Sequence, residues 1–158
     1  MKKFLVVYFS ASGTTAQVAK RLATAIQADL YEIVPQQPYT KADLNWTDRT
    51  SRSSVEMRDP NCRPALKNPV PEVTGYQVIF VGFPVWWYRE PSLIDTFIET
   101  CFFEGQTIVP FATSGGSGIG ETSARLQKLA PQAVVKTGQR FAANVTEQEL
   151  AQWAKSAL

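Results

Sequence analysis

Three runs of consecutive apolar residues stand out along the chain. FLVVYF at 4–9, VIFVGF at 78–83 and TIVPFA at 107–112 contain many β-branched and aromatic residues and do not alternate with polar ones. A half-exposed strand would alternate, so these runs predict interior strands that are buried on both faces. Pro110 lies inside the third run, and we expect a bulge there because proline donates no hydrogen bond to a β-ladder.

Two shorter runs predict the remaining strands. LYEIV at 30–34 has Glu32 between apolar neighbours, which favours a position near a sheet edge. Val134 and Val135 predict a short final strand.

Helical spacing of apolar residues follows four of the five predicted strands. Pro91 suits the first turn of the second helix, and Thr146 with Glu149 predicts a capping box for the last. On this spacing Cys101 is a buried hydrophobe rather than a nucleophile. The expected buried faces are Val18, Ala19, Leu22, Ala23 and Ile26; Leu93, Ile94, Phe97, Ile98, Cys101 and Phe102; Leu126 and Leu129; and Leu150, Trp153, Ala154 and Ala157.

The order of these elements predicts the fold class. Strands separated by helices must be parallel and joined by right-handed crossovers, which gives an open α/β sheet with helices on both faces. The length of 158 residues suits a single domain over 1–158. In such sheets ligands bind outside the carboxyl ends of the strands, where the strand order reverses.

Residues 35–71 differ in composition from the rest of the chain, because charged residues are frequent and aliphatic residues are few. A loop of this length is usually functional or partly helical, and a short helix within 43–54 would pack Leu44 and Trp46 down. The segment is either a solvated charged flap or a lid over a ligand, with Trp46 or Tyr39 as the contact.

Composition narrows the function classes. The net charge of +2 is too small for a nucleic-acid-binding surface. The absence of histidine excludes histidine acid–base chemistry, and the spacing of Cys62 and Cys101 argues against zinc and favours a reducing compartment. The apolar run after Lys2 and Lys3 is too short for a signal peptide, and no stretch is long enough to span a membrane. We therefore expect a cytoplasmic protein without membrane partners.

The first predicted strand runs directly into a loop of hydroxyl side chains. Ser10, Ser12, Thr14 and Thr15 surround Gly13, which permits a tight turn, and the helical pattern starts at once. Such a loop directs backbone N–H groups and the positive end of a helix dipole at one point, which suits an anionic group such as a phosphate. The alternative is an ordinary strand-to-helix connection with a Ser or Thr N-cap.

Two further loops follow interior strands. Three large aromatic residues follow the apolar run at 78–83, and they either fill the core or line a flat aromatic ligand. Four glycines lie within 115–120 after the third strand, and they either form a flexible linker or let the backbone approach a ligand closely. We expect both loops to meet the first one at the carboxyl edge of the sheet. Their residues are Pro84, Val85, Trp86, Trp87 and Tyr88, and Thr113, Ser114, Gly115, Gly116, Ser117 and Gly118.

These motifs resemble those of the flavodoxin family. SASGTT at 10–15 is similar to the flavodoxin phosphate loop, (S/T)-x-(S/T)-G-x-T. Four further stretches are similar to a bacterial branch of short flavodoxin-family proteins: PYTKADLNW at 38–46, SRSS at 51–54, GFPVWWY at 82–88 and PFATSGGSGIG at 110–120.

The resemblance implies a five-stranded parallel sheet of order 2-1-3-4-5 and flavin mononucleotide (FMN) as the cofactor. The isoalloxazine ring would lie between the 84–88 and 113–118 loops. The third loop lacks the G-x-G-D segment and the following tyrosine of typical electron-transfer flavodoxins, so a tyrosine stacked on the outer ring face is not implied. The FMN phosphate would lie on Ser10, Ser12, Gly13, Thr14 and Thr15.

Two functions follow from the resemblance. The first is an FMN-binding electron carrier that exchanges electrons with redox partner proteins. The alternative is an FMN-dependent reductase that takes hydride from NAD(P)H and reduces a quinone-like substrate. A phosphoacceptor signalling domain of the same strand order would need acidic residues after the first strand, and residues 9–12 have none.

Overall fold

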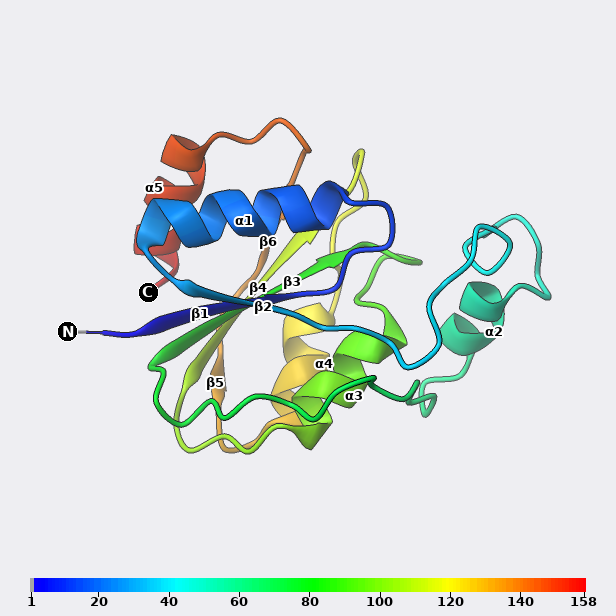
Figure 1. The fold of residues 1–158 in the computed structure, drawn as a ribbon, viewed down its shortest axis with the longest axis horizontal. Helices are drawn as coiled ribbons and strands as arrows, with labels where there is room; N and C mark the ends of the chain where they lie inside the picture. Colours follow the sequence, from blue (N-terminus) through cyan, green and yellow to red (C-terminus); the bar gives the residue numbers. More distant parts are fainter. Residues whose placement is uncertain (1) are drawn as a thin grey trace.

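A parallel sheet runs through the computed structural model, which describes residues 2–158 (Figure 1). Its strands have the order β2-β1-β3-β4-β5, and β6 pairs with β4 as well. Every pairing in the sheet is parallel, so the predicted α/β fold class and strand order are confirmed. The strands are β1 (Phe4–Tyr8), β2 (Asp29–Glu32), β3 (Val78–Pro84), β4 (Thr107–Thr113), β5 (Val134–Val135) and β6 (Gln139–Phe141).

Helices cover both faces of the sheet, as Figure 1 shows. The helices α1 (Thr14–Ile26) and α5 (Glu147–Ala157) lie on one face, and α3 (Ser92–Thr100) and α4 (Thr122–Leu129) lie on the other. Alternate residues of β1 contribute to the two cores: Leu5 and Val7 belong to the α3 side, and Val6 and Tyr8 to the α1 side. Of the helices within residues 2–158, none has the length and apolar character needed to cross a bilayer.

Pro110 does not produce the expected bulge in β4, which pairs with β3 without interruption. The neighbouring ladder is broken instead, because residues 136–138 separate β5 from β6. Lys136 N donates to Ile108 O on that side, and the N–H groups of a strand alternate in direction. The nitrogen of Pro110, which has no hydrogen to donate, therefore faces the break.

The helix in the 35–71 segment lies later than predicted. It is α2 (Arg52–Arg58), with Ser51 as a side-chain N-cap, while residues 43–50 form turns. The side chain of Asp48 accepts a hydrogen bond from Thr50 N over 2.9 Å, and such local bonds compete with helix formation. Trp46 does not pack down and is 72% exposed.

The ends of the other helices test two further predictions. The capping box at the start of α5 is confirmed, since Glu149 N donates to Thr146 Oγ1 and Thr146 N donates to Glu149 Oε1, each over 3.1 Å. Phe102 is not part of a buried face, because α3 ends at Thr100 and the Phe102 side chain is exposed.

Residues 35–71 leave and rejoin the sheet at one place. Gln36 N donates to Ala65 O over 2.8 Å, and Lys67 N donates to Val34 O over 2.9 Å. Between these two bonds the segment extends past the carboxyl ends of the strands, where Figure 1 shows α2. Both ends are thus fixed to each other, while the middle faces the edge at which ligands are expected.

Candidate functional site

Thr113, the last residue of β4, joins the three loops that follow interior strands. Its Oγ1 lies 2.7 Å from Thr15 Oγ1, and both residues are buried. Its carbonyl accepts a hydrogen bond from Val85 N over 3.2 Å. Gly120 lies against the second loop, because a Cβ added to Gly120 would stand 2.9 Å from Tyr88 O. The three loops therefore meet at the carboxyl edge of the sheet.

Ser10 holds the first loop in shape. Its Oγ accepts hydrogen bonds from Gly13 N over 3.1 Å and from Ala16 N over 3.2 Å. Gly13 occupies the N-cap position of α1 with a φ of 97°, in the left-handed region that favours glycine. No atom lies within 4 Å of the place where a Gly13 Cβ would be, so the turn opens onto free space.

The start of α1 offers donors for an anion. Among residues 2–158, the backbone N–H groups of Ser12, Thr14 and Thr15 find no acceptor. The Ser10 hydroxyl accepts two hydrogen bonds and keeps its own proton free to donate, whereas the Thr15 hydroxyl is engaged with Thr113. Unpaired N–H groups at the first turn of a helix, together with the helix dipole, favour a phosphate.

The second loop contains a tight turn of unusual composition. Trp86 and Arg89 exchange backbone hydrogen bonds of 3.0 and 3.2 Å, and Trp87 and Tyr88 between them have φ values of 48° and 63°. Positive φ at both central residues is the pattern of a type I′ turn, which normally contains Asn and Gly. Two bulky aromatics in this conformation cost about 1–3 kcal/mol each, and such strain is concentrated at functional sites.

A cavity of about 480 Å³ lies beside this turn. Trp87 and Tyr88, which are 44% and 70% exposed, stand at its wall. The volume falls within the range of pockets for small molecules and cofactors. None of residues 10–15 lines the cavity, so the first loop and the cavity are separate parts of the same edge of the sheet. The lining residues are Leu44, Trp46, Ser53, Val85, Trp86, Trp87, Tyr88 and Ser117.

Trp86 differs from its two neighbours because it packs into the core. Its ring is perpendicular to that of Phe9, with centroids 5.7 Å apart, and lies 5.3 Å from the ring of Tyr39. Tyr39 in turn lies under Arg52, whose guanidinium is 3.8 Å from the ring centroid. Tyr39 thus ties the 35–71 segment to the second loop, and Leu44, Trp46 and Ser53 of that segment line the cavity.

The third loop is held at its start and open at its glycines. Arg140 Nε donates to Ser114 Oγ over 3.1 Å, and Ser114 Oγ donates to Ser117 O over 2.6 Å. Gly115, Gly116 and Gly118 are exposed, and an added Cβ would meet nothing within 4 Å. Pro84 ends β3 and is half-buried beside Val85.

The comparison with known proteins agrees with this arrangement. A family model described as flavodoxin matches residues 3–157, almost the whole chain. The chain belongs to the flavodoxin family. No curated protein matches it.

Solved structures of flavodoxin-like proteins superpose on it over nearly the full length. A candidate flavoprotein of Bacteroides uniformis is 45% identical, with 98% of each chain covered and a TM-score of 0.91. Another, of Bacteroides eggerthii, is 46% identical, with 99% of this chain and 98% of that chain covered and a TM-score of 0.92. A Lactobacillus acidophilus flavoprotein in complex with FMN shares the fold at 21% identity, with a TM-score of 0.70 and 98% and 99% of the two chains covered.

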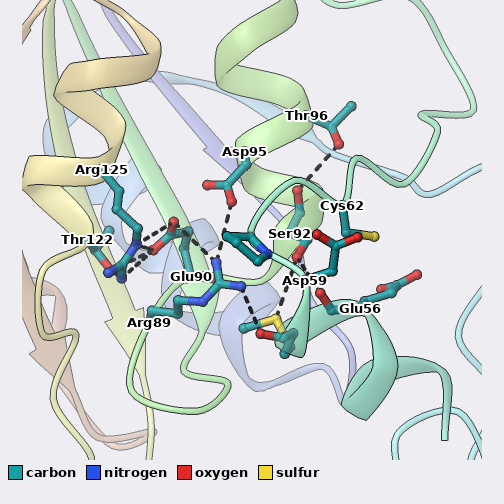
Figure 2. A network of polar contacts seen from close by, with 12 residues as sticks. Glu56, Asp59, Cys62, Arg89, Glu90, Ser92, Asp95, Thr96, Thr122 and Arg125 are labelled. Atoms are coloured by element: carbon teal, nitrogen blue, oxygen red, sulfur yellow. Dashed lines mark hydrogen bonds and ion pairs between the residues drawn. The ribbon is translucent and has the colours of Figure 1, made fainter.

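The tight turn at 86–89 is called the aromatic turn below. This flavodoxin-family chain also contains a buried ionic network at the end of that turn (Figure 2). Glu90 is fully buried, and its carboxylate accepts hydrogen bonds of 2.9 Å from both Arg125 Nη2 and Thr122 Oγ1. Arg89 Nη1 lies 3.7 Å from Glu90 Oε2 and 3.4 Å from Asp95 Oδ2, and Arg89 Nη2 donates to the carbonyl of Met57. The network therefore connects the turn to α2, α3 and α4.

The two buried carboxyl groups of this network have opposite pKa shifts. Burial raises the pKa of Asp95 to about 8, with a further contribution from the neighbouring Glu90 carboxyl. Burial also opposes the charge of Glu90, but hydrogen bonds from Arg125 and Asp95 hold the pKa of Glu90 below its ordinary value. At neutral pH a protonated Asp95 therefore donates to an ionised Glu90, which leaves one negative charge for the two arginines.

Replacement of Asp95 by asparagine is expected to remove a pH dependence of stability. The folded state holds a proton on Asp95 that the unfolded state loses near pH 4, so the free energy of unfolding falls as pH rises from about 4 to about 8. This contribution amounts to about 1.4 kcal/mol per pH unit at most. Asp95→Asn keeps a donor for Glu90 and does not titrate.

Urea unfolding of both proteins between pH 5 and pH 9 measures this effect. The free energy of unfolding of Asp95→Asn should increase relative to that of the unaltered chain as pH rises to about 8. Above that pH the difference between the two proteins should stay constant. Parallel pH profiles for the two proteins would contradict a protonated Asp95.

Sequence reasoning missed this network and several residues of the cavity wall. Leu44 and Ser53 lie in the 35–71 segment, for which the sequence suggested a lid but did not single out these two residues as its contacts. One signal was present, since Asp95 interrupts the apolar stretch SLIDTFI on the face that α3 buries. A carboxylate on a buried helix face requires a partner, but the sequence does not say which.

Proposed function

We propose that this chain binds FMN and carries electrons between redox partner proteins in the cytoplasm. The observation that carries the proposal is the joining of two subsites through Thr113: unpaired N–H groups at the start of α1, and an aromatic cavity beside the second and third loops. The family membership of the chain and the FMN complex of the Lactobacillus acidophilus relative support it.

The residues of each subsite have distinct roles in this proposal. The N–H groups of Ser12, Thr14 and Thr15 and the hydroxyl of Ser10 would bind the phosphate, which needs several donors and no lysine. The cavity wall with Trp87 and Tyr88 would hold the isoalloxazine ring, and Trp46 of the 35–71 segment would cover part of it. Bound FMN supplies the electron chemistry, while the protein binds, orients and shields it.

FMN titration of the purified chain tests the cofactor. We expect saturable quenching of flavin fluorescence and a yellow protein after gel filtration. A colourless protein that takes up no FMN would contradict the proposal.

Reduction is expected to be fast from a reduced redox protein and slow from NADPH alone. The chain has no G-x-G-x-x-G sequence for a dinucleotide, and its 158 residues form one flavodoxin-type sheet. Rapid anaerobic mixing of the FMN-loaded protein with NADPH or with a reduced ferredoxin measures both rates. Saturable flavin bleaching by NADPH within about 0.1–1 s, the time scale of ordinary enzyme turnover, would favour the alternative, an FMN-dependent reductase of quinone-like substrates.

Substitutions in the second loop are expected to separate cofactor contact from core packing. Trp87→Gly and Tyr88→Gly relieve positive φ and should change the free energy of unfolding by less than about 1 kcal/mol. They should weaken FMN binding by about two- to tenfold, because each removes an aromatic wall of the cavity. Fluorescence titration and urea unfolding measure the two effects.

Trp86→Ala provides the comparison: Trp86 also lines the cavity, but it packs on Phe9 and Tyr39, so this variant should lower stability as well. Unchanged FMN affinity in both glycine variants would show that the ring lies elsewhere.

A further inference from the structure

A second cavity, of about 520 Å³, lies on the other side of the aromatic turn. Ser53 of α2 lines the first cavity and Met57 lines the second, one helical turn further along. Likewise, Tyr88 lines the first cavity and the next residue, Arg89, lines the second. The second cavity is therefore adjacent to the proposed flavin site but distinct from it.

Positive charge is concentrated in this second cavity. Five of the sixteen lysine and arginine residues of the chain line it: Arg58, Arg63, Arg89, Arg125 and Lys128. They come from α2, the segment after it, the aromatic turn and α4, so the fold brings together cations that are far apart in sequence.

Carboxylates of the protein satisfy only part of this charge. Glu90 contacts Arg89 and Arg125, and Glu99 contacts Arg63 over 3.4 Å. Asp95 lines the cavity but is protonated at neutral pH, because burial raises its pKa. Five cations against the two carboxylates Glu90 and Glu99 leave three positive charges.

Several of these cations are free to bind a ligand. Arg58 donates only to a backbone carbonyl, that of Arg49, over 2.8 Å. The Lys128 side chain makes no hydrogen bond or ion pair with any residue in 2–158. Arg63 Nε is buried and lacks a partner within the same residues. Such groups favour a ligand that brings acceptor oxygens and more than one negative charge.

Apolar side chains complete the wall of the cavity. Met57, Pro60 and Leu129 line it together with the cations. A wall with both characters suits a ligand that has an organic part as well as an anionic part. The volume is that of a small-molecule pocket.

We propose that this cavity binds a phosphate-bearing organic molecule of the nucleoside diphosphate type. Guanidinium groups match phosphate oxygens in pairs, and the pyrophosphate charge balances the three cations in excess. The proposal does not depend on FMN, because no residue of the 10–15 loop lines the cavity.

Calorimetric titration of the FMN-loaded protein with ADP at low ionic strength tests it. Loading with FMN fills the other phosphate-binding loop, and the Gly13→Asp chain, in which that loop cannot accept a phosphate, provides a second sample. We expect saturable binding of ADP in both samples, tighter than that of inorganic pyrophosphate or of succinate. Binding in the Gly13→Asp chain without any FMN uptake by the unaltered chain would support this site while rejecting the proposed cofactor.

Two exposed cations supply the variants. Lys128→Gln and Arg58→Gln should each raise the Kd of ADP by about three- to tenfold, whereas Lys20→Gln on α1, on the opposite face of the sheet, should leave it unchanged. Absence of saturable binding up to about 10 mM ADP, equal effects of Lys128→Gln and Lys20→Gln, or equal affinity for ADP and succinate would each overturn the proposal.

Discussion

Replacement of Gly13 by aspartate is expected to abolish FMN binding. Gly13 has a φ of 97°, where a side chain costs about 1–2 kcal/mol, and the new carboxylate would lie where the phosphate is expected. Repulsion between like charges about 4 Å apart adds several kcal/mol in a partly buried site. The two effects together exceed about 3 kcal/mol, which corresponds to more than a hundredfold increase in Kd measured by fluorescence titration.

Gly13→Asn is the matched control, because it has the same shape as aspartate without the charge. Asparagine also tolerates positive φ better than most residues, so this variant should retain FMN binding at reduced affinity. An Asp variant that binds FMN as well as the unaltered chain would place the phosphate away from the start of α1.

Replacement of Glu90 by alanine is expected to lower the free energy of unfolding by about 3–5 kcal/mol. The Glu90 side chain is fully buried, and its removal leaves Arg125 without a carboxylate partner and Arg89 with only Asp95. Loss of the network should also loosen the aromatic turn, since Glu90 follows it directly. Urea unfolding measures the change in stability.

Glu99→Ala provides the comparison for this variant. Glu99 also pairs with an arginine, Arg63, but its side chain is 52% exposed, and pairs of that kind contribute about 0–1 kcal/mol. Similar losses of unfolding free energy in the two variants would show that burial does not determine how much the Glu90 ion pairs contribute to stability.

The sheet could be predicted from the sequence because its information is local. Each interior strand is a continuous apolar run, and the residues of β1 are divided between two cores, as burial on both faces requires. The capping box of α5 depends on two residues three positions apart. The rule for parallel sheets predicts that the three loops lie at one edge, and it needs no contact between them.

The parts that could not be predicted depend on distant residues. Glu90 and Arg125 are 35 positions apart, and nothing in either local sequence indicates the pair. Gly82 lies inside β3, where an added Cβ would collide with the ring of Phe111, a contact that only the register of two strands creates. The helix expected within 43–54 does not form there, and in this case the cause is local. A hydrogen bond from the backbone to the Asp48 side chain favours turns over the helix that the apolar pattern predicted.

The paired ends of residues 35–71 have a consequence for how such a protein can evolve. Because Gln36 bonds to Ala65 and Lys67 bonds to Val34, the chain enters and leaves this segment at the same point of the sheet. Insertions or deletions between those bonds cost little loop-closure entropy and need not move any strand. Related proteins could therefore replace residues 35–71 as a unit and so change which molecules bind at the carboxyl edge, while the sheet and its helices stay the same.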